Sequence, residues 1–274
     1  MDLFVLSGCK YRAIFLILQN FLCIFLKKVT FVYMFYKTRG VILHNRPYSD
    51  AYSIVLAYTE EFGPVSYLVA RSKGKKTTVS KTLFHPLAVL DLEADHQNLK
   101  EIHRIREAKP HFPLLNLLQN PVKASVSIFL AEFLSRILRE VHPNKALFDY
   151  LSQSIRILDL SEENYTNFHL SFMVNLTSFM GFHPNAETYS SHAFFDMQNG
   201  VFVSCKPFSP YFLNPDESRF LYRLLRINYD NMGAFRFTGN DRRLIIDRIL
   251  EYYRIHLSNF PEIKSLDVLR EVFG

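Results

Sequence analysis

Tryptophan is absent from the 274-residue sequence, and only three cysteines occur, at Cys9, Cys23 and Cys205. No two of them form a C-x-x-C pair, so the sequence indicates neither a disulfide framework nor a thiolate zinc site. It also lacks a Gly-rich phosphate loop, a G-x-S-x-G nucleophile motif and an H-E-x-x-H metal motif. These absences predict a protein that is not an enzyme and that uses no cofactor and no metal.

The ten histidines offer little further chemistry, because they are scattered along the chain. His183, His192 and Cys205 share one loop-rich stretch, and a metal site there is one interpretation. Their irregular spacing and the missing fourth ligand argue against it. His169 lies among phenylalanines on an expected helix, which is more typical of a packed core histidine than of a ligand.

Apolar residues make up 49% of the sequence, and 26 Phe and 15 Tyr supply most of their bulk. A sizeable core is therefore expected, in one large or two modest domains. The formal net charge of +6 favours an anionic partner without identifying one. The sparse cysteines suit a reducing cytoplasm.

The first 33 residues differ from the rest, because residues 13–26 are almost continuously apolar and are flanked by basic residues. This run is too short to span a bilayer, which needs roughly 20 residues. Three interpretations remain: translation that starts at Met34, a membrane-associating tail, and a signal peptide without a clear cleavage site. We favour the start at Met34, so residues 1–33 are expected to be a non-native extension or an apolar tail, with no stable membrane association.

Residues 34–111 carry short alternating segments that are typical of β-strands. The five expected strands cover residues 37–45, 51–59, 65–71, 82–93 and 99–108. Five strands in so short a stretch predict a closed OB-fold β-barrel, and an SH3-like barrel is the alternative that strand count does not exclude. Pro86 falls inside the fourth segment, so this strand is expected to be an edge or to contain a bulge there.

Residues 112–274 have a helical period and predict an all-α helical domain with a loop-rich insert at 182–214. The longest apolar stripe runs from Val126 to Val141 at i, i+3, i+4 and i+7 spacing. Gly181 is expected to end a helix. The expected helix caps are Asn144, Ser161, Asn214, Asn240 and Ser265.

The third expected strand runs directly into a cationic tip, where Gly74 is surrounded by Arg71, Lys73, Lys75 and Lys76. Nucleic-acid binding on a small barrel needs cations for phosphates and flat rings on which bases stack. A merely solvated loop is an equally good interpretation of the tip alone. The candidate rings are Tyr36, Tyr48, Tyr52, Tyr67 and Phe84, and alternation is expected to bury some of them. The binding residues selected from the sequence are Arg39, Arg71, Lys73, Lys75, Lys76, Lys81, Arg104 and Tyr67, although Val65 and Val69 share the face of Tyr67.

The helical half carries its own arginines. Arg136 and Arg139 lie on the polar side of the long stripe, and Glu132 is spaced to pair with Arg136. Arginines beside apolar residues can receive an acidic peptide with an apolar tip, whereas each taken singly is more simply a solvated charge.

The order of these features resembles the RecO family of bacterial recombination mediators over about 240 residues. The similarity rests on Arg39-Gly40, on Tyr48-Ser49-Asp50, on the segment from Tyr58 to Gly63, and on the basic loop that follows, and it continues through "GFHP" at 181–184. It also favours Met34 as the start.

This resemblance implies an amino-terminal OB domain, a helical domain and a non-enzymatic role in the cytoplasm, on the nucleoid. The implied activities are binding of single- and double-stranded DNA, annealing of complementary strands, and loading of RecA onto DNA coated by single-strand-binding protein. The implied partners are RecR and the acidic carboxy-terminal tail of single-strand-binding protein, with Arg136 and Arg139 as our candidates for holding that tail.

The sequence departs from the family in one respect. Many members carry two C-x-x-C pairs after the "GF-x-P" segment, whereas Cys205 is the only cysteine here. No structural zinc is expected, and the packing of this region is expected to come from Phe194, Phe195, Val201, Phe202 and Val203. An OB-fold RNA-binding module is the main alternative function, and a membrane-attached interaction protein is the third.

Overall fold

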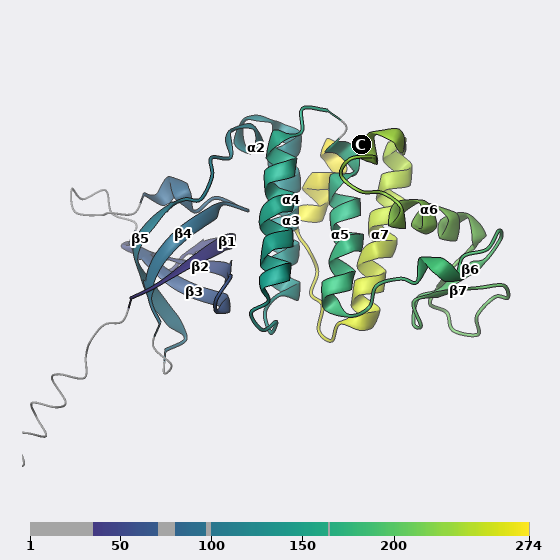
Figure 1. Cartoon of the computed structure of the whole chain (residues 1–274), viewed down its shortest axis with the longest axis horizontal. Coiled ribbons are helices and arrows are strands. Elements are labelled where there is room, and N and C mark those ends of the chain that lie inside the picture. Colours follow the sequence, from purple (N-terminus) through teal and green to yellow (C-terminus); the bar gives the residue numbers. More distant parts are fainter. Residues whose placement is uncertain (1–34, 71–79, 97–99, 164, 274) are drawn as a thin grey trace, which may run out of the picture.

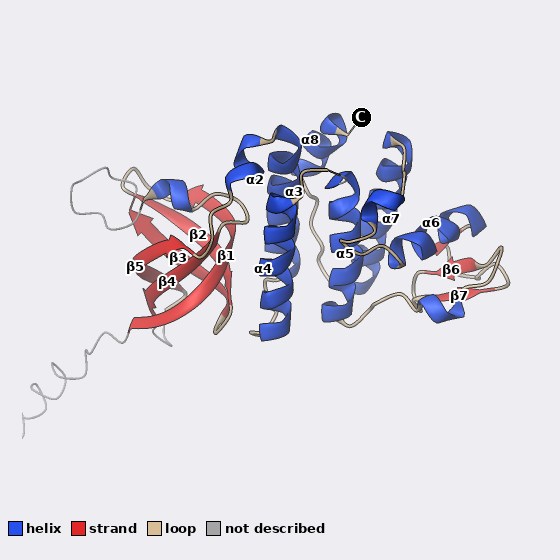
Figure 2. Ribbon diagram, turned by 45° about the horizontal axis from the view of Figure 1, so that its top comes forward, coloured by secondary structure: helices blue, strands red, loops and turns tan. Residues whose placement is uncertain are grey.

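The computed structural model describes residues 35–70, 80–96, 100–163 and 165–273. A β-barrel forms one end of the molecule, a group of upright helices forms its middle, and a small sheet with one covering helix forms the other end (Figure 1). The barrel and the small sheet therefore lie far apart, on either side of the helices (Figure 2).

The amino-terminal barrel is closed and has five strands. They are β1 (Phe35–Pro47), β2 (Tyr52–Thr59), β3 (Gly63–Ala70), β4 (Val89–Asp95) and β5 (Ile102–Pro110). Their order is β1-β2-β3-β5-β4, and β1 closes the barrel by pairing with both β2 and β4. Only the β3–β5 pair is parallel. This topology confirms the predicted OB-type barrel and decides against the SH3-like alternative.

The fourth strand is shorter than predicted. It begins at Val89, and residues 81–83 form a 3₁₀ turn, η1 (Lys81–Leu83), instead of strand. Pro86 precedes the strand, so the prediction of an edge or bulge at this proline was wrong, because β4 pairs with β1 and β5. Proline removes a ladder donor and constrains the residue before it, which explains why pairing starts after it.

Seven helices follow in the described residues. They are α2 (Leu115–Gln119), α3 (Pro121–Ile137), α4 (Lys145–Leu160), α5 (Phe168–Met180), α6 (Pro215–Leu225), α7 (Gly239–His256) and α8 (Ser265–Val272), with 3₁₀ turns η2 (Tyr165–Asn167), η3 (Ala186–Thr188) and η4 (Met232–Ala234). The long apolar stripe is confirmed on α3, where Phe129, Phe133 and Leu134 are fully buried. The stripe carries α3 into the core of the helical domain.

Several predicted helix ends are confirmed. Asn144 caps α4 by accepting a hydrogen bond from the Leu147 N–H at 3.1 Å. Asn214 and Glu217 form a reciprocal capping box at the start of α6. Gly181 ends α5 in the left-handed conformation, with φ of 84°.

Three predicted caps were wrong. The Ser161 hydroxyl donates to the Ile157 carbonyl and closes the end of α4. Asn240 lies inside α7, which Thr238 caps in a reciprocal box with Asp241. Ser265 is the first residue of α8, and its hydroxyl donates to Glu132 of α3. Local partners decide the first two cases, whereas the partner of Ser265 lies 133 residues away in sequence.

The loop-rich insert contains strands that the sequence did not predict. They are β6 (Phe194–Asp196), β7 (Val201–Val203) and β8 (Phe212–Leu213), in the order β7-β6-β8. The helical domain is therefore not purely α-helical. Phe195 and Phe202 are buried as predicted and pack with Met197 and with Tyr252 of α7. The other three predicted packing residues of this insert, Phe194, Val201 and Val203, are only half-buried.

The barrel and the helical domain share a hydrophobic core. Val41, Leu43, Tyr58 and Val89 of the barrel belong to the same buried cluster as α3 and α4, and we call this contact the apolar seam. The Tyr58 hydroxyl accepts a hydrogen bond from the Asn144 N–H at 3.2 Å and donates to the His142 carbonyl at 3.3 Å. The turn before β3 also touches this connection, because a Cβ on Gly63 would lie 3.0 Å from the Val141 carbonyl oxygen.

Gly63→Ala should therefore lower the free energy of unfolding more than Gly181→Ala. Both glycines have positive φ, 68° and 84°, but a Cβ at Gly181 meets nothing within 4 Å. We expect a loss of about 1 kcal/mol for Gly181→Ala and about 2 to 3 kcal/mol for Gly63→Ala in urea unfolding. Equal losses would mean that the Gly63 turn does not press on the helical domain.

Candidate nucleic-acid interface and interdomain groove

The cationic tip falls outside the described residues. Arg71, Lys73, Lys75 and Lys76 therefore stay predictions, and Lys81 is placed only as the first residue of η1. The strand register nevertheless shows which barrel residue lies beside the last described residue before the tip. Ala70, the last residue before it, pairs with Tyr52 at the start of β2.

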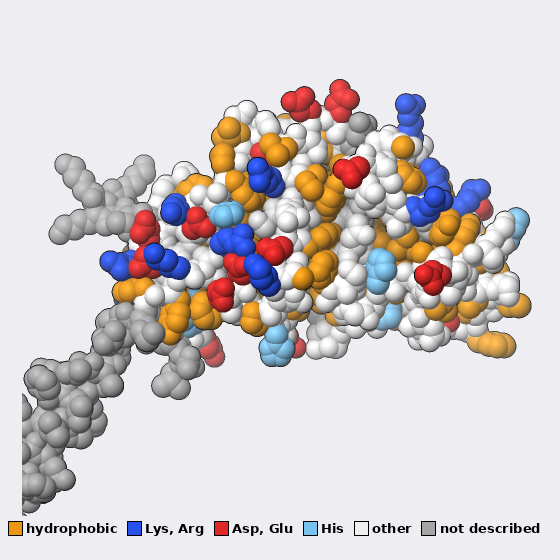
Figure 3. Space-filling model, viewed as in Figure 1, with side chains coloured by type: hydrophobic (Ala, Val, Ile, Leu, Met, Phe, Trp, Pro, Cys, Tyr) orange, Lys and Arg blue, Asp and Glu red, His pale blue; other side chains and the backbone are white. Residues whose placement is uncertain are grey.

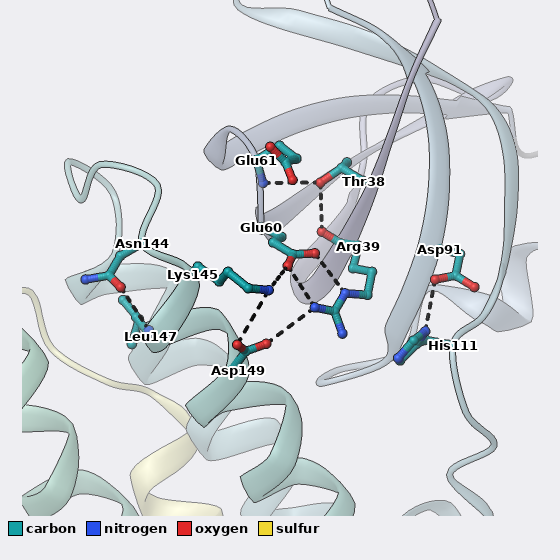
Figure 4. A network of polar contacts seen from close by, with 10 residues as sticks. All are labelled: Thr38, Arg39, Glu60, Glu61, Asp91, His111, Asn144, Lys145, Leu147 and Asp149. Carbon is teal, nitrogen blue, oxygen red and sulfur yellow. Dashed lines mark hydrogen bonds and ion pairs between the residues drawn. The ribbon is translucent and has the colours of Figure 1, made fainter.

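Arg39 binds carboxylates of its own chain at the joint between the domains (Figure 4). Its guanidinium donates to both oxygens of Glu60 at 2.8 Å and contacts Asp149 of α4 at 3.3 Å. Lys145 reaches the same carboxylates, at 2.7 Å from Glu60 and 3.6 Å from Asp149. We call these four residues the charged joint.

The surroundings of Arg39 are unfavourable for a phosphate. The shallow hollow beside it is lined by more carboxylates than cations, namely Glu60, Glu61, Asp91, Glu93 and Glu107 against Lys37, Arg39 and Lys109. Acidic and basic side chains alternate over this part of the barrel in Figure 3. The prediction that Arg39 contacts nucleic acid is therefore replaced by a structural role.

Tyr67 is not available as a stacking ring. Its side chain is fully buried in the barrel core, and its hydroxyl lies 3.1 Å from Nε2 of His96. Burial raises the pKa of the Tyr67 phenol, so the group stays neutral. Alternation along β3 places Tyr67 inside together with Val65 and Val69.

Among the described residues, the large rings exposed on the barrel are Phe35, Tyr48 and Tyr52, at 41%, 65% and 41%. The Arg106 guanidinium lies 4.9 Å from the centroid of Phe35, whereas Tyr48 and Tyr52 stand at the other end of β1 and at the start of β2. Tyr52 pairs with Ala70, so it stands next to the point where the cationic tip begins. Both tyrosines are among the candidate rings drawn from the sequence. Tyr52 shares its face of β2 with the buried Ile54 and Tyr58, so its exposure comes from its place at the start of the strand. Arg104 is exposed on β5, opposite Leu68 of β3, and it makes no ion pair with a described residue.

A groove of about 1140 Å³ lies between the barrel and α3. Its floor is apolar and includes Leu56, Pro64 and Ile128, the last of which is 47% exposed. Its cationic residues are Arg46, Arg136, Arg139 and Lys264, and its only carboxylate among the described residues is Glu132. The structure thus brings the predicted pair Arg136 and Arg139 to one cationic groove, which we call the interdomain groove.

The negative charge of Glu132 is already bound. It accepts hydrogen bonds from the N–H and the hydroxyl of Ser265 at 2.9 and 2.6 Å and from Arg136 at 3.3 Å. Burial alone would raise the pKa of Glu132, but these hydrogen bonds outweigh burial and lower it. The groove therefore keeps a positive potential. The pKa of His44, which also lines the groove, is lowered mainly by partial burial and to a smaller extent by the positive charges of Arg46 and Arg136.

No metal site accompanies these surfaces in the part of the chain that the structure describes. There, no three His, Cys, Asp or Glu side chains gather closely enough to hold an ion. His183 contacts the Thr177 hydroxyl at 2.8 Å, and Cys205 is exposed. None of the helices in the described residues has the length and hydropathy of a membrane span. The apolar run at 13–26 lies outside those residues.

Two family models divide the chain between the barrel and the helices. The model described as Recombination protein O N terminal matches residues 34–114, and the one described as Recombination protein O C terminal matches residues 118–267. The chain belongs to the RecO family. This confirms the resemblance drawn from the ordered sequence features.

Several curated RecO relatives align over nearly their whole length. The DNA repair protein RecO of Azobacteroides pseudotrichonymphae genomovar. CFP2 is 52% identical over 240 residues, which cover 88% of this chain and 100% of that protein. Those of Phocaeicola vulgatus and Porphyromonas gingivalis are 42% and 36% identical, covering 88% and 86% of this chain and 100% and 98% of each relative. Membership in the RecO family supports a role in DNA repair and recombination.

The charged joint should give the protein a measurable acid sensitivity. The hydrogen bond from Arg39, with help from Lys145, lowers the pKa of Glu60 to about 2 from a usual 4.5. A depressed carboxyl pKa stabilises the fold above pH 4.5 and stops doing so as the pH falls toward 2. Glu60→Gln should lower the free energy of unfolding at pH 7 by about 1 to 2 kcal/mol, and this difference should shrink toward zero at pH 2 to 3.

Glu93→Gln is the matched control for this prediction. It removes an ion pair of the same 2.8 Å length to Arg106, but within the barrel and with an Arg106 side chain that is 61% exposed. We expect its cost at pH 7 to stay below about 0.5 kcal/mol. If Glu60→Gln behaves like this control at every pH, the joint does not stabilise the domain contact.

Proposed function

We propose that the protein is a DNA repair and recombination mediator without catalytic activity, acting on the bacterial nucleoid in the cytoplasm. In this proposal it binds single- and double-stranded DNA, anneals complementary strands, and assists the loading of RecA onto DNA coated by single-strand-binding protein. RecR and the acidic tail of single-strand-binding protein are its proposed partners. Membership in the RecO family is the observation that carries the proposal.

The proposed DNA path starts at the end of the barrel where Tyr48 and Tyr52 are exposed. Rings that face solvent can stack on bases, and the tip from Arg71 to Lys76 supplies cations for phosphates beside them. Arg104 and Lys81 are retained as proposed contacts, whereas Arg39 and Tyr67 are not. Binding of this kind depends on backbone charge and stacking, so it should show little sequence preference.

The interdomain groove is our proposed site for the acidic tail. An acidic peptide with an apolar end needs cations beside an apolar floor, and the groove supplies both. The Arg136 side chain is 26% exposed, and of its guanidinium it is Nη2 that donates to Glu132, at 3.3 Å, so we propose that its remaining outer N–H groups donate to the peptide carboxylate. Arg139 hydrogen-bonds only weakly, from Nε to the Ser135 carbonyl at 3.4 Å, and is free to pair.

An RNA-binding module remains the second candidate, because stacking rings and cations serve RNA as well as DNA. Competition between an RNA and a single-stranded DNA of the same sequence separates the two. A clear preference for RNA would overturn the mediator proposal.

Charge and ring variants at the barrel end should have different signatures. If four to six cations engage, log K should fall with log salt at a slope of roughly −3 to −5, and replacing Arg71, Lys73, Lys75 and Lys76 by Ala should flatten it by about 3. Tyr52→Leu should weaken single-strand binding by about tenfold and leave the slope unchanged, because stacking carries no charge. Fluorescence anisotropy over a salt series measures both quantities.

Tyr211→Leu is the control for the ring variant, because Tyr211 is 42% exposed but lies directly before β8 of the small sheet, away from the barrel. It should bind DNA like the unaltered protein. An unchanged salt slope in the fourfold variant would remove the tip from the interface, and equal affinities of the two tyrosine variants would remove Tyr52.

The groove should matter only when single-strand-binding protein coats the DNA. Arg139→Gln/Lys264→Gln should anneal bare complementary strands at the normal rate, but it should lose most of its activity, fivefold or more, on coated strands. Strand annealing followed by gel or fluorescence gives both rates. Arg156→Gln/Arg254→Gln removes two exposed arginines outside the groove and should leave both rates unchanged. Equal losses in the two double variants would contradict a tail site in the groove.

A further inference from the structure

A row of three arginines follows one side of α6 and its C-cap; Arg219 and Arg226 are exposed, and Arg223 is half-buried. Arg219, Arg223 and Arg226 follow one another at i, i+4 and i+7, so they share one side of the helix over about 10 Å of its length. The opposite side packs through Leu221, Leu224 and Leu225 into the core of the domain. Basic side chains gather over α6 and the adjoining α7 in Figure 3. We call this row the α6 arginine row.

These arginines are not used to hold the fold by ion pairs. Within the described residues, neither Arg223 nor Arg226 forms one, and Arg219 meets only the highly exposed Asp216 at 3.5 Å. The neighbouring Arg248 of α7 differs sharply, because Glu217 and Glu251 bind it at 2.8 and 2.7 Å. Asp241 of α7 is engaged in the capping box with Thr238.

Aromatic rings hold the guanidinium groups in place. Arg223 lies 5.8 Å from the centroid of Phe235 and 5.3 Å from that of Phe237. Arg226 lies 5.8 Å from the centroid of Tyr222, whose ring is stacked on Tyr189. Cation–π attraction at these distances limits where a guanidinium can move and does not use up its N–H groups, which can still donate to an anion. The row is thus arranged in advance for an anion.

The features of the row favour a nucleic-acid backbone over an acidic peptide. Arginine forks bind phosphate oxygens in pairs, and a straight row suits a ligand with repeated anionic groups. An apolar-tipped peptide would also need an apolar floor beside the cations, as in the interdomain groove. The apolar pocket at α6, lined by Phe220, Leu221 and Leu224, has a volume of only about 40 Å³, and none of the three arginines lines it.

The row also lies far from the barrel. The barrel forms one end of the molecule, whereas α6 covers the small sheet at the other end, with α3, α4, α5 and α7 between them (Figures 1 and 2). A strand bound at Tyr52 and the tip would leave α6 open. We propose that the α6 arginine row binds the phosphate backbone of a second nucleic-acid strand, so that one molecule holds two strands at once. This inference rests on the proposed DNA binding by the barrel.

The test measures capture of a second strand. One DNA strand is fixed to a bead, the full-length protein is added, and a fluorescent strand that is not complementary to the first is then offered. Arg223→Gln/Arg226→Gln should bind the fixed strand within twofold of the unaltered protein, but should retain at least fivefold less of the fluorescent strand. The salt slope of this second step should flatten by about 1.4, which is 0.7 for each of two lost phosphate contacts.

Arg156→Gln/Arg254→Gln is a close control. It removes the same charge from two exposed arginines that also lie over rings, 5.9 Å from Phe112 and 5.9 Å from Phe260. It should capture the second strand normally. Equal capture of the second strand by both double variants overturns the proposal. That result is also expected if two protein molecules bridge the strands, each through its own barrel.

Two further outcomes are distinct. If the unaltered protein fails to bind the fixed strand, the proposed DNA-binding function itself fails. If Arg223→Gln/Arg226→Gln captures the second strand normally but loses a fluorescent acidic peptide, the row is a peptide site and the inference is wrong.

Discussion

The apolar seam between barrel and helices is the contact on which the rest of the structure depends. A five-stranded barrel of this size has a small core of its own, and one side of it is completed only by the helical domain, through Val41, Leu43 and Tyr58. The seam fixes α3 against β1, and this contact creates the interdomain groove along its edge. Polar contacts at the ends of the seam, from Tyr58 and from the charged joint, then determine how the two domains are oriented.

The basic residues divide into two groups by what they contact. Arg39, Arg248 and Arg270 are each bound by two carboxylates and connect elements of the fold. Arg104, Arg139, Arg223 and Arg226 have no ion pair with a described residue and stand on surfaces or in the groove. A formal net charge of +6 does not reveal this division, because it weights both groups equally. The criterion is whether a described carboxylate pairs with the cation. Cations with such a partner stabilise the fold, and those without one can bind an external anion.

Periodicity predicted the larger elements well, because burial on one face determines where apolar residues recur. The strands at Tyr52 and Gly63 and the stripe on α3 follow this rule. One of the errors concerns a side chain whose partner is distant in sequence. The Ser265 hydroxyl donates to Glu132, which lies 133 residues earlier in the sequence. The residues around Ser265 therefore give no sign that its hydroxyl is unavailable to cap a helix. The strands of the insert are two or three residues long, too short for a period to appear.

The candidate site was less predictable than the fold for the same reason. A cation on the first strand looks the same in sequence whether it faces a phosphate or Asp149, which lies 110 residues further on. The structural role of Arg39 therefore affects how mutations at this position are interpreted in genetic experiments. A screen for repair-deficient alleles would recover substitutions at this position readily, and in a table of phenotypes they would resemble DNA-binding mutants. Measured protein abundance in the cell would separate them, because a loosened domain joint exposes the chain to proteolysis whereas a lost phosphate contact does not.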